Sequence, residues 1–374
     1  MKKHLIISIG TDAGKESKYF VLLDYLNKNN ISTDLCVLAH TFRKNRSFSL
    51  NYAKNIKKKN FFYVTKFIYL LLSIIRYKII IITGLRFNQK FLKLFKLFGK
   101  KIIFLEDGFN NDIGCNLVYD KCLLKGFYSQ YLFEKRNHIK DKEFKVGCID
   151  IPLFKKKNKI KNSCIFFLTS PQYIDKWYYD LFVETINQLE SKKKNIFIKF
   201  HPSFKNLYKF NFVSDENKKL VENIKEISQN YNKIENDYYE ILPNVSFCIS
   251  SQTNSFLESN YFYKPFLFVE RINFYNNNKN YEENGKEKLN FYDYGLKEIN
   301  SKIKINLAKD NLFTFFGSEC ALKNINRVLD EYTDEKIESF VKNENEKIDN
   351  IRKRISEYDG EKIFEKIVQE IKNI

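Results

Sequence analysis

Short apolar runs alternate with segments of helical periodicity along most of this chain. Such runs fit buried strands, and the segments between them fit helices that cover a parallel sheet. In the first half the predicted strands are 5–9, 34–39, 61–64, 78–83 and 101–105, and the predicted helices are 18–27, 67–75 and 89–98.

The same alternation resumes beyond residue 160. All five prolines lie at position 152 or later, and the basic stretch 155–159 follows the first of them, which places a domain boundary there. The predicted strands of this half are 163–168, 195–200, 245–249 and 265–269, and the predicted helices are 179–189, 255–263, one from 333 onward and 362–371.

The predicted fold class is therefore α/β. Two similar halves joined by a basic linker are typical of GT-B architecture, in which two Rossmann-like domains face each other across a cleft. We expect domains at 1–154 and 155–332, followed by C-terminal helices in 333–374 that pack back on the first domain. Periplasmic binding proteins and other doubled folds share this pattern, so the function has to be argued from the site.

The composition favours an anionic partner only weakly. Lys and Arg number 64 against 45 Asp and Glu, which gives a net charge of +19, and 44% of the residues are hydrophobic, enough to bury a core in each half. Lys, Asn and Ile are abundant throughout, and this bias explains most of the charge. The chain shows no RNA-recognition, KH or zinc-finger pattern, so we expect no nucleic-acid partner.

The cysteines and the N-terminus predict a cytoplasmic protein. Seven cysteines are scattered without a CxxC pair, which fits a reducing compartment, and the apolar run 5–9 is too short for a signal peptide. Lys66 and Arg76 interrupt the apolar stretch 61–83, so it does not read as a membrane span. Its helix 67–75 is unusually apolar, and a peripheral contact with the inner membrane is the alternative to simple burial.

Several common catalytic signatures are missing from the sequence. It has no GxGxxG, GxxxxGK[ST] or HExxH motif, and its four histidines show no metal-ligand spacing. We therefore expect neither a metal nor a cofactor, and no hydrolase triad.

Acidic residues end one strand of the first half. Glu106-Asp107-Gly108 follows the apolar run 101–105. A carboxylate at the carboxyl end of a strand can take the proton of an attacking hydroxyl, and a neighbouring carboxylate can raise its pKa. A surface turn is the alternative explanation. We prefer Asp107 to Glu106 as the base, because Glu106 continues the strand and can face the interior.

A histidine follows a strand of the second half. Lys199-Phe200-His201-Pro202 comes at the end of the run 195–200, where proline stops the strand and holds His201 at the sheet edge. His201 can hydrogen-bond or protonate a departing phosphate, and Lys199 adds positive charge. An ordinary polar strand end is the alternative.

Two further segments supply hydroxyl groups at strand ends. Ser250-Ser251-Gln252-Thr253-Asn254 lies between the strand 245–249 and the helix 255–263, and Ser170 follows the strand 163–168. Hydroxyls and free N–H groups at a helix start form a phosphate cradle, although helix capping uses the same residues.

The order of these motifs resembles the bacterial GT-B sialyltransferases, including the lipooligosaccharide sialyltransferases and capsule polysialyltransferases. The resemblance covers residues 100–265. It implies an inverting, metal-independent transfer of sialic acid or a related nonulosonic acid from a CMP-activated donor to a galactoside or sialoside hydroxyl of a cell-surface glycan.

The resemblance also implies roles for individual residues. Glu106 or Asp107 would be the general base. His201 and Pro202 would hold the CMP donor, with His201 helping the phosphate to leave, and Ser250 and Ser251 would contact the donor phosphate. Thr253, Ser170 and Lys199 are further donor-binding candidates.

One position departs from the family pattern. The lipooligosaccharide branch carries an aspartate directly after the Ser-Pro pair, and this chain has Gln172, which cannot take a proton. The departure favours Asp107 or Glu106 as the base and leaves Asp175 as the nearest substitute carboxylate.

Two alternatives stay open. CDP-glycerol-dependent and other polyol-phosphate transferases of envelope synthesis resemble the KxHP and Ser-rich region too, and donor preference would distinguish them. The non-enzyme alternative is a protein that binds a polyanion or a membrane surface, for which a change at Asp107 would matter little.

Overall fold

The computed structural model of the chain contains two compact units. Unit 1 comprises Met1–Leu153 and Arg352–Ile374, and unit 2 comprises Phe154–Ile351. The division falls between Leu153 and Phe154, one residue before the predicted boundary. The structure describes residues 3–8, 15–38, 57, 59–83, 89–106, 118–126, 142–155, 157–171, 174–201, 204, 214–234, 238–250, 258–259, 261–262, 264, 266–269, 282–283, 286–287, 314–316, 333–343, 352–353 and 356–374.

Unit 1 is built on a seven-stranded parallel sheet with the order β3-β2-β1-β4-β5-β6-β7. Its central strands read as continuous apolar runs because helices cover both faces. The order of the first six strands is that of a doubly wound Rossmann sheet, with a topological switch point between β1 and β4. The strands are β1 (His4–Ser8), β2 (Thr33–Leu38), β3 (Phe61–Val64), β4 (Ile79–Thr83), β5 (Lys101–Leu105), β6 (Lys121–Leu124) and β7 (Glu143–Lys145).

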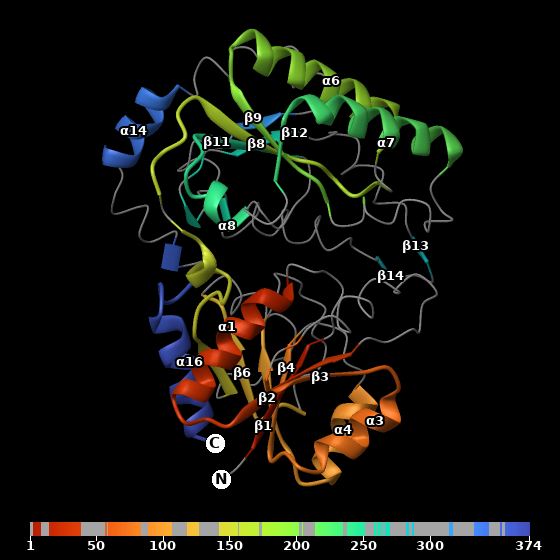
Figure 1. Cartoon of the computed structure of the whole chain (residues 1–374), viewed down its shortest axis with the longest axis vertical. Helices are drawn as coiled ribbons and strands as arrows, with labels where there is room; N and C mark the ends of the chain where they lie inside the picture. The colour runs from red at the N-terminus through yellow and green to blue at the C-terminus, as the bar shows by residue number, and fades with distance from the viewer. Residues whose placement is uncertain are drawn as a thin grey trace. The chain divides into compact units, whose positions relative to one another are not determined.

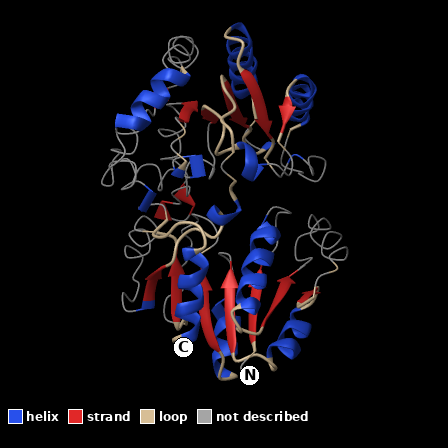
Figure 2. Ribbon diagram, turned by 60° about the vertical axis from the view of Figure 1, so that its left-hand side comes forward, coloured by secondary structure: helices blue, strands red, loops and turns tan. Residues whose placement is uncertain are grey.

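Two pairs of helices cover this sheet (Figure 1). α3 (Phe67–Ile74) and α4 (Gln89–Leu97) share a core cluster with Leu5 and Ile7 of β1. α1 (Lys15–Lys28) packs against α16 (Lys362–Lys372), with the rings of Tyr25 and Phe364 5.2 Å apart, and both views show the two helices side by side (Figures 1 and 2).

Unit 2 repeats the architecture with a six-stranded parallel sheet of order β10-β9-β8-β11-β12-β15. In chain order this is again the Rossmann arrangement, and its switch point lies between β8 and β11. The strands are β8 (Ser163–Phe167), β9 (Asn195–Lys199), β10 (Asn232–Lys233), β11 (Phe247–Ser250), β12 (Phe266–Val269) and β15 (Thr314–Phe316).

The helices of unit 2 begin where the sequence supplies caps. The Asp175 carboxylate caps α6 (Lys176–Ser191), and the Ser214 hydroxyl caps α7 (Asp215–Ile227). Both helices pack on one face of the sheet (Figure 1). The remaining described elements are α8 (Tyr238–Ile241), α14 (Asp334–Asn343), the 3-10 turns Ile151–Leu153 and Ser228–Asn230, and the antiparallel pair β13 (Glu282–Glu283) and β14 (Lys286–Glu287).

The predicted C-terminal segment 333–374 is divided between the units. α14 belongs to unit 2, and α16 packs on unit 1, as expected for a closing helix. Lys121 at the start of β6 anchors α16 through an ion pair of 2.8 Å with Glu370. Unit 1 is therefore completed by the last residues of the chain.

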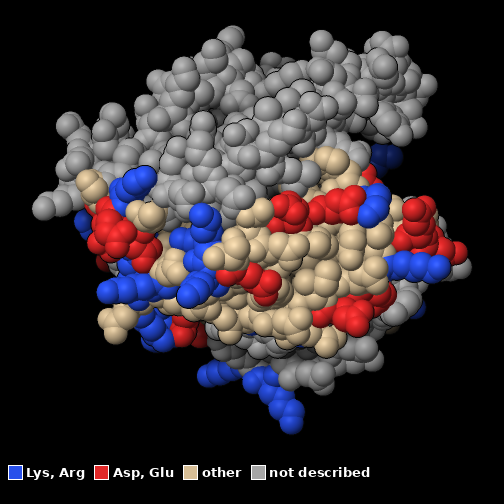
Figure 3. Space-filling model, turned by 90° about the horizontal axis from the view of Figure 1, so that it is seen from above, with Lys and Arg blue, Asp and Glu red and all other residues tan. Residues whose placement is uncertain are grey.

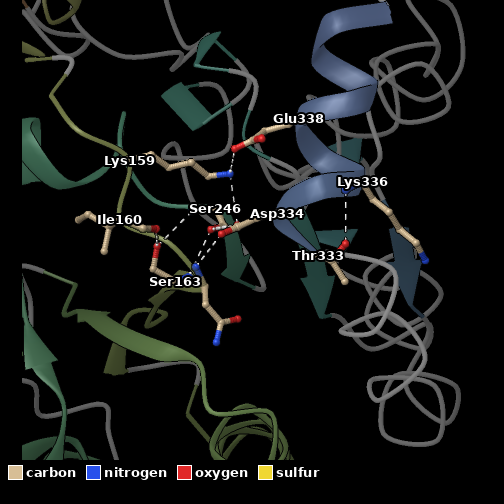
Figure 4. A network of polar contacts seen from close by, with 9 residues as sticks. Lys159, Ile160, Ser163, Ser246, Thr333, Asp334, Lys336 and Glu338 are labelled. Atoms are coloured by element: carbon tan, nitrogen blue, oxygen red, sulfur yellow. Dashed lines mark hydrogen bonds and ion pairs between the residues drawn. The ribbon is translucent and has the colours of Figure 1, made fainter.

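A polar network fixes the start of α14 at the amino end of the unit 2 sheet (Figure 4). The Thr333 hydroxyl accepts a hydrogen bond from the Lys336 N–H and so caps the helix. The Asp334 carboxylate accepts from the Ser246 hydroxyl and from the Asn162 N–H, and Lys159 pairs with it at 3.4 Å. The carboxylate therefore connects α14 to the residues that enter β8 and β11.

Candidate functional site

The carboxyl ends of three neighbouring strands meet at the switch point of unit 2. Phe167 of β8 lies in register with Lys199 of β9 on one side and with Ser250 of β11 on the other. The Leu168 N–H then bonds to the Lys199 carbonyl at 3.0 Å and extends the pairing by one residue. The residues that follow each strand, Ser170 and His201 among them, are thus placed at one edge, where open α/β sheets bind ligands.

His201 is exposed at this edge, and its position is set by two aromatic side chains. The rings of Phe200 and Phe204 stack edge to face at 5.1 Å and pack on the core under α6 and α7. The His201 carbonyl accepts the Phe204 N–H at 3.0 Å and closes the turn. These contacts of Phe200 and Phe204 hold the backbone of His201 at the strand end, which suits a group that has to meet a ligand.

Lys199 lies against an aromatic residue of α8, which in turn bonds to an acidic residue further along the chain. Its ammonium stands over the ring of Tyr238 at 5.1 Å from the centroid, and that ring packs against Phe167. The Tyr238 hydroxyl donates to the carboxylate of Glu258. Sequence reasoning missed Tyr238 and Glu258, and no local motif marks either residue.

The segment after β8 is buried and partly fixed. Thr169 is buried, and its N–H donates to the Tyr178 hydroxyl of α6 at 3.1 Å, where burial raises the Tyr178 pKa. Ser170 is half-buried. Asp175, the substitute carboxylate, accepts the Tyr178 N–H at 2.9 Å as the cap of α6. Its carboxylate therefore already has a structural role.

In unit 1, Glu106 sits directly after β5 with only 4% of its surface exposed. Its carboxylate accepts the N–H of Lys125, the residue after β6, at 2.9 Å, and its own N–H donates to the Leu123 carbonyl. Glu106 thus links two strand ends from inside the unit. This agrees with the expectation that Glu106 faces the interior.

Three further buried charges lie near Glu106. Lys18 of α1 pairs with Asp150, which follows β7, at 3.0 Å, and Lys125 is buried beside them. Burial alone lowers the pKa of Lys125, but the negative charges of the neighbouring Asp150 and Glu106 oppose this effect, and the pKa lies above its ordinary value. Two cations therefore balance two carboxylates, as buried charges require.

This buried quartet of Lys18, Glu106, Lys125 and Asp150 was missed by sequence reasoning except for Glu106. Lys125 carries a signal that could have found it, since it ends an apolar run as Glu106 does. Beside the quartet, burial raises the pKa of the Cys148 thiol to about 12, so this cysteine stays protonated at neutral pH. All five described cysteines are free and buried, as expected for small core residues.

The other predicted site residues lie outside the described part of the chain. These are Asp107, Pro202, Ser251 and Thr253; Ser250 is described as the last residue of β11 but its side chain is not. Among the described residues, no three His, Cys, Asp or Glu side chains converge as metal ligands. In the same part of the chain, every helix is too short or too polar to cross a bilayer.

No protein-family model matches the chain, and no curated protein is similar to it in sequence. Solved structures share its fold over the whole chain at 12% identity. MnaA of S. aureus, in a co-structure with UDP, gives a TM-score of 0.56 over 96% of its chain. A putative UDP-N-acetylglucosamine 2-epimerase from Listeria monocytogenes gives 0.61 over 96%, and the wall teichoic acid polymerase TagF gives 0.55 over 89%.

These similarities establish the fold. Two parallel α/β sheets with Rossmann order, matched across the full chain by epimerase and polymerase structures, make this a GT-B glycosyltransferase-like fold, as the sequence predicts. The sialyltransferase family is not supported by these comparisons and stays a prediction from the motifs.

Proposed function

We propose that the chain is a transferase of envelope-polysaccharide synthesis whose donor substrate is activated by a pyrimidine nucleotide. The observation that carries the proposal is that β9, β8 and β11 end in register, at Lys199, Phe167 and Ser250, at the switch point of unit 2. Solved structures of the same fold include one bound to UDP and a teichoic acid polymerase, which supports a nucleotide donor and a polymer product.

The donor phosphate has a suitable place at this edge. His201 is exposed beside the packed rings of Phe200 and Phe204, Lys199 supplies a cation two residues earlier, and β11 ends in register at Ser250. A histidine and a cation stabilise the charge that develops on a departing phosphate. Donor binding at this edge through Lys199, His201 and Ser250 is therefore the core of the proposal.

The reaction proposed is displacement by an acceptor hydroxyl. The hydroxyl oxygen attacks the anomeric carbon of a sugar donor, its proton passes to a carboxylate, and the bond from that carbon to the phosphate oxygen breaks as the nucleotide leaves. Asp107 is the proposed base, because Glu106 is buried and holds the Lys125 N–H. For a CDP-polyol donor the attacked atom is the β-phosphorus, and CMP leaves.

Two donor classes follow from different observations. The similarity to a teichoic acid polymerase favours a CDP-polyol, and the similarity to a structure bound to UDP favours a UDP-sugar. The order of Glu106-Asp107-Gly108, His201-Pro202 and Ser250-Ser251 favours a CMP-activated nonulosonic acid. We give the first class precedence, since it rests on similarity over the whole chain, and we place the enzyme in the cytoplasm, where such donors are made.

The test is acceptor-dependent release of nucleotide by the full chain. CDP-glycerol, UDP-N-acetylglucosamine and a CMP-nonulosonic acid would be offered in turn, each with and without a mixed glycan and polyol-phosphate acceptor set. Release with one donor that needs the acceptor and is lost in His201→Ala supports the proposal. Release that His201→Ala leaves unchanged, or no release with all three donors, contradicts it.

A further inference from the structure

Exposed apolar side chains gather on one part of unit 1. Of the eight large apolar residues that are exposed in the described part of the chain, seven lie between Tyr63 and Phe98. Globular proteins rarely leave such residues in contiguous patches without a partner. They are Tyr63, Ile68, Tyr69, Leu72, Ile75, Leu97 and Phe98.

The helix α3 is apolar on both of its sides. Leu70 and Ile74 are fully buried against the sheet, whereas Ile68, Leu72 and Ile75 follow at helical spacing on the outer side, where Leu72 and Ile75 are 59% and 64% exposed. An ordinary surface helix would carry charged residues there. The outer side of α3 is therefore built to meet an apolar environment.

The end of α4 adds to the same surface. Leu97 and Phe98 are exposed, and Lys100, two residues further on, donates to the carbonyls of Ile75 and Tyr77 at 3.0 and 2.7 Å. The two helices share one core cluster and lie side by side (Figure 1). We call Ile68, Tyr69, Leu72, Ile75, Leu97 and Phe98 the α3/α4 surface.

Charge identifies the partner of this surface. Residues 35–105 contain 16 Lys and Arg and not one Asp or Glu. Lys66 precedes α3, Arg76 follows Ile75, and Lys93 lies one helical turn before Leu97; all three are exposed. In unit 2, by contrast, acidic and basic residues are interspersed on the described part of the face in Figure 3, and pairs such as Lys218–Asp215 form on α7.

We propose that the α3/α4 surface docks unit 1 on an anionic lipid bilayer. Apolar side chains on a helix, with a tyrosine among them and basic residues at the flanks, are suited to insert at the boundary between acyl chains and headgroups. A soluble polyanion would use the cations and leave the apolar residues without a role. A second copy of the chain would carry the same positive charge and be repelled.

The experiment measures partition of the full chain onto vesicles by flotation. Vesicles of equal parts phosphatidylglycerol and phosphatidylcholine should bind it, and vesicles of phosphatidylcholine alone should bind it much more weakly. Leu72→Gln with Ile75→Gln should lower the partition coefficient roughly tenfold or more, and Arg76→Gln with Lys93→Gln by about fivefold for each charge. All four side chains are exposed, so these variants should fold.

Matched controls come from elsewhere in the chain. Val21→Gln removes the one large apolar side chain outside this region that is exposed among the described residues, and Lys219→Gln with Lys233→Gln removes two exposed cations of unit 2. Both controls should partition as the original chain does. In a separate variant, Leu72→Trp, the emission of the new tryptophan should shift to the blue when anionic vesicles are added.

Three results would overturn the proposal. The first is that the folded chain fails to float with anionic vesicles. The second is that binding to vesicles or to a soluble polyanion depends on Arg76 and Lys93 but not on Leu72 and Ile75. The third is that Leu72→Gln with Ile75→Gln abolishes a dimer in sedimentation and leaves vesicle binding unchanged.

Discussion

The ammonium of Lys18 lies 3.0 Å from the carboxylate of Asp150, and the two residues are only 3% and 6% exposed. They join the start of the chain to the segment after β7. With Glu106 and Lys125 they place two cations and two carboxylates inside unit 1, at the strand ends that lead to the proposed base.

Removal of one partner of this pair should destabilise unit 1 strongly. Lys18→Met leaves the Asp150 charge buried without its cation, and the free energy of unfolding should fall by about 3–5 kcal/mol. Denaturant titration measures it, and Lys18→Met combined with Asp150→Leu should cost less than Lys18→Met alone. Lys176→Met, which breaks an exposed pair with Asp180, should cost less than about 1 kcal/mol. Equal losses at the two lysines would contradict the account.

Substitutions of the two acidic residues after β5 should affect different quantities, one the catalytic rate and the other the stability. Asp107→Asn should lower kcat by about a hundredfold or more because the base is lost, with little change in stability. Glu106→Gln should mainly lower the free energy of unfolding, since the Glu106 carboxylate accepts a buried hydrogen bond from the Lys125 N–H. The opposite assignment, with activity lost only in Glu106→Gln at unchanged stability, would make Glu106 the base.

Gly147 should tolerate no side chain. Its φ is +103°, and a Cβ there would lie 2.8 Å from Ile363 and 2.9 Å from the Ser356 hydroxyl. That hydroxyl accepts a hydrogen bond from the N–H of Cys148, the next residue. Gly147→Ala should therefore cost about 2 kcal/mol or more and loosen α16, measured by denaturation and by hydrogen exchange in that helix. Gly99→Ala is the matched control: its φ is +69° with open space around, so only about 1–2 kcal/mol of backbone strain applies.

Unit 2 should lose stability in acid through Asp334. Burial alone raises the pKa of this carboxyl, but hydrogen bonds from Ser246 and Asn162 and the charge of Lys159 outweigh it and hold the pKa below its ordinary value. A depressed pKa gives stability that is present above about pH 3.9, the unfolded value, and lost as the pH falls through the folded value.

The check is the free energy of unfolding of unit 2 followed from about pH 6 to about pH 3. The original chain should lose more stability over this range than Asp334→Asn, which has no proton to take up. Asp180→Asn is the control for loss of a surface carboxylate. Parallel curves for the original chain and Asp334→Asn would rule out this contribution.

Most of the fold could be predicted from hydrophobic periodicity. The strands Phe61–Val64 and Lys101–Leu105 have the predicted bounds, and the helix at 362–371 ends one residue later than expected. The elements that were not predicted include β6, β7 and α7: β6 and β7 are short, β7 is only half-buried, and α7 is largely charged with a narrow apolar side. Weak apolar patterns of this kind carry little signal in sequence alone.

The candidate site was predictable in part. The sequence predicts the places of Lys199, His201 and Glu106 at the ends of strands, because the end of an apolar strand can be recognised from the local sequence. Tyr238 and Asp150 were not found, since they reach Lys199 and Lys18 through contacts between segments distant in sequence. Asp175, which the sequence offers as the nearest substitute carboxylate, accepts the Tyr178 N–H and caps α6, a contact that the sequence alone did not indicate.

The central claim is that the switch point of unit 2 binds the nucleotide of the donor. Its most direct test is calorimetric titration of the full chain with CMP, CDP and UDP, alongside His201→Ala and the unit 2 control Lys219→Gln. The account predicts that at least one of these nucleotides binds to the original chain and to Lys219→Gln, and that His201→Ala binds it at least tenfold more weakly at unchanged stability. Binding that His201→Ala leaves intact, or no binding of any of the three, would contradict it.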